Sequence, residues 1–185
     1  MKTVTKEFRV YDFEELSEKA QEKAYQKWYE IQDFACSDEY RDTMKAFEEA
    51  FNVKVYDWNV DTCNYDYRFR LNDMPEFKFE DENRKTLKEK IRVSKYIIGR
   101  LDSKKDTTNC IFTGFCADCD ILGIYNMVKN WQAFFLDYDS FIRASLENFF
   151  SAWSKDMEYS FSMENFKENY ANEESYLENG KVFYE

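Results

Sequence analysis

Three of the five cysteines lie within one short stretch, NCIFTGFCADCDILG, which runs from Asn109 to Gly123. Cys116 and Cys119 form a CxxC pair, and Cys110 precedes the pair by six residues. Three thiolates could approach one zinc ion, but a tetrahedral zinc site needs a fourth ligand. Because the chain contains no histidine, that ligand would have to be another cysteine or a carboxylate. The candidates for the fourth position are Cys36, Cys63, Asp118 and Asp120.

Two other roles for the CxxC pair are open. A redox pair of the thioredoxin type requires the motif to open a helix after a strand in a βαβ unit, and the surroundings fit that pattern only loosely. In the third role the cysteines are small apolar side chains packed beside Phe112 and Phe115, with Gly114 allowing close backbone approach. Structural zinc sites usually show two paired ligand spacings, so the sequence favours the packing role and predicts no metal and no cofactor.

The sequence shows no recognisable catalytic centre. Without histidine there is no imidazole base to activate a serine or a cysteine. The phosphate-binding patterns GxxxxGKS and GxGxxG do not occur. Asp and Glu are so numerous, 37 in 185 residues, that no pair stands out as a general acid and base. We therefore predict a protein that is not an enzyme.

The charge is distributed unevenly along the chain. The net charge is −11, but residues 84–105 carry nine Lys and Arg against two Asp and Glu. Lys85, Lys88 and Arg92 in this basic segment are candidates for contacts with nucleic-acid phosphates. The overall negative charge would repel a polyanion at long range, and a basic helix face that pairs with acidic residues of the same protein explains the segment equally well.

Acidic residues interleaved with Phe and Tyr form two clusters, within residues 73–82 and 164–178. Such a surface could occupy a positively charged nucleic-acid groove, with carboxylates where phosphates would sit and rings at the centre of the contact. Tyr65 and Tyr67 could serve as neighbouring aromatic anchors. The candidate acidic residues are Asp73, Glu76, Glu80, Asp81, Glu82, Glu164, Glu168, Glu173 and Glu174. An acidic protein whose charge serves only its solubility would have the same composition.

The elements that position these residues follow from the spacing of apolar side chains. Residues 4–11 alternate imperfectly and predict a strand. Ser17 is a helix N-cap, and a second helix is expected from Ser37. The predicted buried faces are Ala20, Ala24, Trp28 and Ile31 in the first helix, and Tyr40, Met44, Phe47 and Phe51 in the second.

From residue 53 the apolar period shortens to two, which predicts an antiparallel hairpin that FKF after Pro75 could extend. Tyr65, Tyr67, Phe69 and Leu71 take one face of its second strand, and Asp66, Arg68 and Arg70 the other. A basic helix over 83–101 should turn Leu87, Ile91, Ser94 or Lys95, and Ile98 inward.

Beyond the basic helix, CIFTGF reads as a short strand, followed by helices near 121–135 and 140–159 and a short one capped by Ser162. Asn179-Gly180 predicts a closing hairpin. The expected fold is α+β, with a small antiparallel sheet packed by several amphipathic helices. We predict one domain, 1–185, with two lobes, 1–82 and 106–185, joined by the basic helix 83–102.

The chain has no run of about 18 apolar residues and no apolar segment of a secretory signal near its N-terminus. We therefore expect no membrane contact. The protein should remain in the cytosol that makes it, where cysteines stay reduced.

Three segments resemble those of a group of small phage and mobile-element proteins. VYDFEELSEKAQEKAYQKWY is similar to a strand followed by an F-x-E-L-S-x-x-A-x-x-K-A helix, and YLENGKVFY to the closing hairpin of that group. FTGFCADCDILG, the most specific of the three, resembles a TG-[FY]-CADxDxL segment. The pattern requires no cysteine at the position of Cys119, which implies that the CxxC pair is incidental. Together the segments cover roughly 40–45 residues.

Some members of that group resemble type II-A anti-CRISPR proteins, which inhibit the RNA-guided Cas nuclease. The resemblance implies a protein of the bacterial host cytosol that binds the guide-loaded nuclease and blocks engagement or cleavage of target DNA. It implies no catalytic residues. Two alternatives stay open, a nucleic-acid-binding regulator that uses the basic segment 84–105 and a structural module stabilised by zinc.

Overall fold

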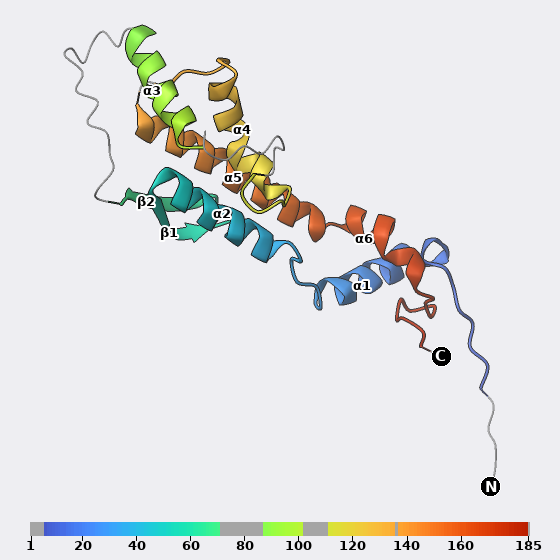
Figure 1. The fold of residues 1–185 in the computed structure, drawn as a ribbon. Helices are drawn as coiled ribbons and strands as arrows, with labels where there is room; N and C mark the ends of the chain where they lie inside the picture. The colour runs from blue at the N-terminus through green and yellow to red at the C-terminus, as the bar shows by residue number, and fades with distance from the viewer. Residues whose placement is uncertain (1–5, 71–86, 102–110, 136, 185) are drawn as a thin grey trace. The chain divides into compact units, whose positions relative to one another are not determined.

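The computed structural model describes residues 6–70, 87–101, 111–135 and 137–184 (Figure 1). The chain divides into two compact units, the first made of residues 1–34 and 156–185 and the second of residues 35–155. The first unit therefore joins both ends of the chain, and the basic helix lies inside the second. Among the described residues, no helix is both long enough and apolar enough to cross a lipid bilayer.

The first unit is built on α1, which lies beside α6 (Figure 1). Its elements are η1 (Phe13–Glu15), α1 (Glu18–Tyr29), the end of α5 (Tyr138–Ser160), α6 (Met163–Asn169) and η2 (Ala171–Glu173). Ser17 is the N-cap residue of α1, as predicted, but its hydroxyl makes no capping hydrogen bond. The predicted cap at Ser162 is confirmed, since its hydroxyl accepts a hydrogen bond from the Asn165 N–H at 3.1 Å. The prediction that Ile31 is buried was wrong, because α1 ends before it and leaves the side chain 71% exposed.

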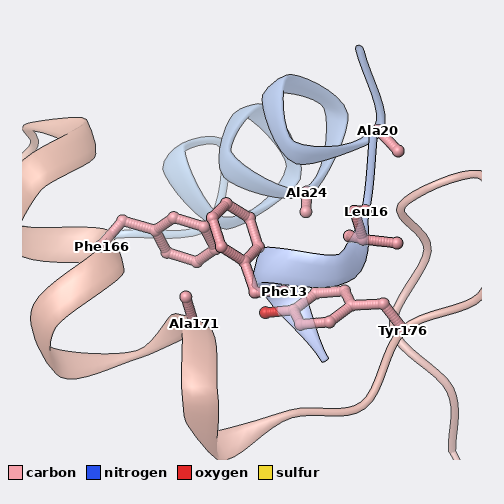
Figure 2. Close-up of a cluster of buried hydrophobic side chains, with 7 residues drawn as sticks. All are labelled: Phe13, Leu16, Ala20, Ala24, Phe166, Ala171 and Tyr176. Carbon is pink, nitrogen blue, oxygen red and sulfur yellow. The ribbon is translucent and has the colours of Figure 1, made fainter. Parts of the chain in front are cut away.

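Aromatic rings from both ends of the chain form the core of the first unit. Figure 2 shows Phe166 of α6 meeting Phe13 of η1, with Tyr176 on the other side of Phe13. The ring centroids lie 5.2 Å apart for Phe13 and Phe166 and 5.8 Å apart for Phe13 and Tyr176. The small side chains of Ala20 and Ala24 let α1 approach this cluster closely.

The predicted strand over residues 4–11 was wrong in its described part. Residues 6–10 have no regular structure, and only Tyr11 pairs with another segment, through an antiparallel bridge to Tyr176. The Tyr11 N–H donates to the Tyr176 carbonyl at 2.8 Å and the Tyr176 N–H donates back at 2.9 Å. Tyr176 also bridges to Val182 across the turn at Gly180, so the predicted closing hairpin is reduced to one bridge.

The second unit packs helices against a two-stranded antiparallel sheet, which confirms the predicted α+β fold (Figure 1). The elements are α2 (Ser37–Phe51), β1 (Val53–Asn59), β2 (Asn64–Phe69), α3 (Leu87–Gly99), α4 (Ala117–Lys129) and most of α5. The predicted buried face of α2 is confirmed for Tyr40, Met44, Phe47 and Phe51. In the hairpin, Val53 pairs with Phe69 and Val55 with Tyr67. Asp66, Arg68 and Arg70 are exposed, as predicted.

A buried carboxylate fixes α2 to the hairpin. Glu48 is almost completely buried, and its Oε1 accepts a hydrogen bond from the Val55 N–H at 2.9 Å. The Lys54 ammonium donates to Oε2, also at 2.9 Å. These contacts satisfy the carboxylate where it has lost water, and they hold the start of β1 against the end of α2.

Two predictions for the middle of the chain were wrong. On α3 the predicted burial of Ser94 is confirmed, but the other buried side chains are Val93 and Ile97, whereas Ile91 and Ile98 are only half-buried and Lys95 is exposed. The apolar residues of α3 are spaced so that more than one face of the helix could be the buried one. Which face is buried therefore depends on the neighbouring helices. Residues 111–115 form a bend rather than a strand, and α4 starts shortly after it at Ala117, with Cys116 as its N-cap. The proposed FKF extension lies outside the described residues.

Candidate partner-binding surface

The acidic residues predicted to contact a partner fall into two groups. Glu164, Glu168, Glu173 and Glu174 are all exposed, and they lie close in sequence on α6, on η2 and directly after it. Asp73, Glu76, Glu80, Asp81 and Glu82 lie outside the described residues. Counted by sequence, the first unit holds 8 Lys and Arg against 16 Asp and Glu, a net charge of −8. Its exposed carboxylates therefore attract cationic surfaces.

The candidate basic residues lie on or near α3 in the second unit. Arg92 is exposed on this helix. Lys88 belongs to its first turn, and Lys85 lies outside the described residues. The structure therefore places Arg92 and Lys88 on one helix, apart in sequence and unit from the acidic residues of α6 and η2.

An apolar groove of about 480 Å³ lies in the first unit between α1, the α6–η2 segment and the end of the chain. Trp28 forms part of its floor, and its ring centroid lies 5.1 Å from that of Phe166 and 5.2 Å from that of Tyr170. Packing on two sides fixes the indole in place. The apolar or aromatic lining consists of Ala24, Trp28, Ile31, Phe166, Tyr170, Tyr176, Val182 and Tyr184.

The rim of the groove combines exposed apolar groups with charges. Ile31 and Tyr184 are 71% and 80% exposed, so a large part of the apolar lining faces solvent. The charged lining residues are Glu173, Glu174, Lys23, Lys27 and Lys181. An apolar centre with a polar rim is the arrangement found at protein–protein contacts, where buried aromatic side chains supply most of the binding energy.

One carboxylate of α6, Glu168, is held by an aromatic hydroxyl, and it does not line the groove. The Tyr159 O–H donates to the Glu168 Oε2 at 3.0 Å. This hydrogen bond to a negative acceptor raises the pKa of the Tyr159 hydroxyl above its usual value. Tyr159 therefore stays neutral and keeps the Glu168 carboxylate at a defined place on the exposed side of α6.

The proposed aromatic anchors Tyr65 and Tyr67 pack within the second unit. The Tyr65 ring stacks on Phe150 with centroids 5.1 Å apart, and burial raises the pKa of its hydroxyl to about 12. The Tyr67 hydroxyl donates to the Asp139 Oδ1 at 2.7 Å. Both side chains are half-buried, and their contacts within the unit hold β2 against α5.

We expect Tyr67→Phe to lower the free energy of unfolding of the second unit by about 1–2 kcal/mol, because it removes a hydrogen bond to a carboxylate. Urea denaturation followed by tryptophan fluorescence measures the change. Tyr56→Phe is the matched control, since Tyr56 lies on the hairpin with its side chain 40% exposed. Equal losses for the two variants would contradict the anchoring role of Tyr67.

The cysteines are not core residues where the structure describes them. Cys116 is the N-cap of α4 and Cys119 lies in its first turn, and both are exposed, as are Cys36 and Cys63. The prediction that the pair packs as small apolar side chains was wrong, because another side chain takes the inward position of this turn. Among the described residues, no cluster of three or more Cys, Asp or Glu side chains could hold a metal ion.

The inward side chain is Asp118, which is fully buried. Its Oδ2 accepts hydrogen bonds from the N–H groups of Phe112, Thr113 and Gly114 at 2.9, 2.8 and 3.2 Å. Its Oδ1 accepts from the hydroxyls of Thr43 at 2.7 Å and Thr113 at 2.8 Å. Asp118 therefore ties the bend over 111–115 to α2. In the predictions from sequence, Asp118 is considered only as a zinc ligand. The sequence does contain a signal for its structural role: Thr113-Gly114 shortly before a helix with Asp in its first turn is a pattern in which the carboxylate can accept hydrogen bonds from the backbone of the preceding bend.

No protein-family model matches the chain, and no curated protein or solved structure matches it either.

Proposed function

We propose that this chain is an anti-CRISPR protein, a non-catalytic inhibitor that binds a guide-loaded type II Cas nuclease and blocks engagement or cleavage of target DNA. The observation that carries the proposal is the apolar groove of the first unit, which Glu173 and Glu174 line, together with the exposed carboxylates Glu164 and Glu168 of α6 in the same unit. Such a surface suits a protein partner with a cationic face. The three segments that resemble the phage protein group indicate which class of partner that is.

The mechanism follows from the charge of the partner. A Cas nuclease holds its RNA–DNA heteroduplex in a positively charged channel and contacts mainly the backbone. Carboxylates at Glu164, Glu168, Glu173 and Glu174 would occupy positions that phosphates otherwise take. The net charge of −8 on the first unit would speed the encounter at low salt. Inhibition would be stoichiometric, because the inhibitor is bound and not turned over.

The lysines at the groove limit how the surface can dock. Lys23, Lys27 and Lys181 line the groove together with Glu173 and Glu174, so the surface is not uniformly acidic. Binding would therefore place the lysines against acidic groups of the partner and the glutamates against basic ones. A mixed rim of this kind sets the orientation of a complex more than its affinity.

A cleavage assay with a guide-loaded type II nuclease tests the proposal, with target binding measured alongside cutting. Inhibition by the wild-type protein should saturate near one inhibitor per nuclease. In the variant Glu164→Lys, Glu168→Lys, Glu173→Lys, Glu174→Lys, the concentration for half-inhibition should rise at least about tenfold, the effect of a 1.4 kcal/mol loss in binding. The reason is that four attractive charges become repulsive while the exposed positions cost little stability.

A control variant carries the same change in net charge on the second unit. Asp42, Glu49, Asp61 and Asp66 are exposed there, and their replacement by lysine should leave inhibition nearly unchanged. Equal weakening by both variants would mean that only total charge matters. Full inhibition after reversal of the α6–η2 cluster together with Glu80, Asp81 and Glu82 would exclude mimicry of DNA by acidic residues.

Two results would remove the proposal altogether. One is the absence of inhibition across several type II nucleases. The other is a salt-sensitive gel shift of DNA by the protein alone that disappears when Lys85, Lys88 and Arg92 become alanine, which would favour a nucleic-acid-binding regulator.

A further inference from the structure

Two exposed thiols lie at the start of α4, that of Cys116 on the N-cap residue and that of Cys119 in the first turn. The hydrogen bonds of the turn show how the two residues are spaced. The Cys119 N–H donates to the Cys116 carbonyl at 2.9 Å, and the Asp118 N–H donates to the Phe115 carbonyl at 3.1 Å. Both bonds span three residues, as is common where an α-helix begins, and α4 is an α-helix from Ala117. Side chains of residues i and i+3 at such a helix end are neighbours on one face. Cys116 and Cys119 have this spacing.

The separation of the two backbone positions suits a disulfide. Helical geometry, whether α or 3₁₀, puts the Cα atoms of Cys116 and Cys119 about 5–6 Å apart. Disulfides join Cα atoms that are roughly 4.4–6.8 Å apart. The buried hydrogen bonds of Asp118 hold the turn in this form, while both thiols remain accessible to reagents in solution.

We infer that Cys116 and Cys119 form a reversible dithiol–disulfide pair, a site of oxidation by low-molecular-weight disulfides such as glutathione disulfide. One protein thiolate attacks a sulfur of glutathione disulfide, forms a mixed disulfide and releases one glutathione thiolate. The second protein thiolate then attacks the protein sulfur of the mixed disulfide and releases the second glutathione. The two protein thiols lose two electrons and two protons, and one glutathione disulfide becomes two glutathione molecules.

This pair is a modification site and not a thioredoxin-type active centre. In the described ranges, the only sheet is an antiparallel hairpin, and the pair follows a bend instead of a strand. The inference uses residues of the second unit, and it does not depend on the proposed inhibition of a nuclease.

The experiment equilibrates the full-length chain in buffers with a range of glutathione to glutathione disulfide ratios, followed by acid quenching, alkylation and mass spectrometry. A variant with Cys36→Ser, Cys63→Ser and Cys110→Ser isolates the pair, and the wild-type chain is measured in parallel. As the ratio falls, we expect both cysteines of the variant to escape alkylation, which leaves a mass two hydrogen atoms below that of the unalkylated dithiol. In both proteins, peptide mapping should join Cys116 to Cys119.

Adding Cys119→Ser to that variant should abolish the internal disulfide and leave a glutathione adduct on Cys116. If glutathione adducts alone accumulate on the intact pair at every ratio, the inference is overturned. A wild-type disulfide that joins Cys110 to either member of the pair, instead of Cys116 to Cys119, also overturns it.

Discussion

Asp118→Ala is expected to lower the free energy of unfolding of the second unit by about 3–5 kcal/mol, because it removes several hydrogen bonds to a buried carboxylate and each such bond to a charged group contributes about 1.5–3 kcal/mol. The Asp118 carboxylate accepts three backbone N–H bonds from the bend and two hydroxyl bonds, one of them from Thr43 of α2. Alanine would remove the acceptor of the half-buried N–H groups of Phe112 and Thr113, while the Thr43 and Thr113 hydroxyls, 3.2 Å apart, would keep only each other as acceptors. Urea denaturation followed by circular dichroism and tryptophan fluorescence measures the loss.

Asp120→Ala is the matched control. Asp120 lies in the same first turn of α4, so its replacement removes the same charge from the same helix terminus. The favourable interaction of such a charge with a helix N-terminus is about 0.3–1 kcal/mol. A loss for Asp118→Ala no larger than that for Asp120→Ala would show that helix-end charge, and not the hydrogen-bond network, explains the effect.

The same residue predicts how stability depends on pH. Burial alone would raise the pKa of the Asp118 carboxyl, but the hydrogen bonds from Thr113 and Thr43 outweigh burial and hold the pKa below its usual value of 3.8. Because the pKa is lower in the folded protein, the ionised Asp118 carboxylate stabilises the fold fully at pH values above its pKa in the unfolded chain. This stabilisation is lost as the pH falls through its pKa in the folded protein. The difference in stability between wild type and Asp118→Ala should therefore be constant near neutral pH and shrink below about pH 4.

Gly180→Ala is expected to destabilise the first unit by about 2–4 kcal/mol. Two effects add up: alanine is strained in the left-handed backbone conformation of this residue, and its Cβ would overlap a neighbouring carbonyl group. Gly180 has a φ of +82°, and a Cβ there would overlap the carbonyl oxygen of Ala20 and lie 2.9 Å from its carbonyl carbon. The turn would have to move away from α1. Hydrogen exchange should then speed up at the amides of Tyr176 and Phe183, which donate across this end of the chain. Because the turn lines the groove, inhibition should weaken too.

Gly114→Ala separates the two causes. Gly114 has a similar φ of +88°, but a Cβ at this position meets nothing within 4 Å. Only the backbone cost of about 1 kcal/mol should appear, measured by urea denaturation of the second unit. If both glycine variants lose the same stability, the close approach of Gly180 to Ala20 contributes nothing.

Local spacing alone predicted the elements whose neighbours in sequence are also their neighbours in space. The buried face of α2 follows from apolar residues three and four apart, and the hairpin follows from period-two alternation around a short connection. Ser162 identified the start of α6 because an N-cap hydrogen bond reaches only three residues along the chain. These interactions are short-range, so the sequence contains all the information they need.

Two failed predictions concern residues whose partners are distant in sequence, and a third concerns a local side-chain contact. The N-terminal strand needed a neighbouring strand, but its described part meets only Tyr176, 165 residues after Tyr11, through one bridge. The inward face of α3 depends on which helices cover it. In the described part of CIFTGF a bend forms instead of a strand, because the N–H groups of Phe112, Thr113 and Gly114 bond to the carboxylate of Asp118, which is only four to six residues away. Alternation and propensity cannot specify such partners.

The sequence by itself determined the α+β class, most helix positions, the hairpin and the acidic character of the chain ends, because these depend on composition and on spacing within one element. The tertiary structure alone decided that both ends share one unit and form an apolar groove beside exposed carboxylates. It also decided that Asp118 is buried while Cys116 and Cys119 are exposed. These outcomes depend on which surfaces meet, and burial energy summed over long-range contacts settles that choice.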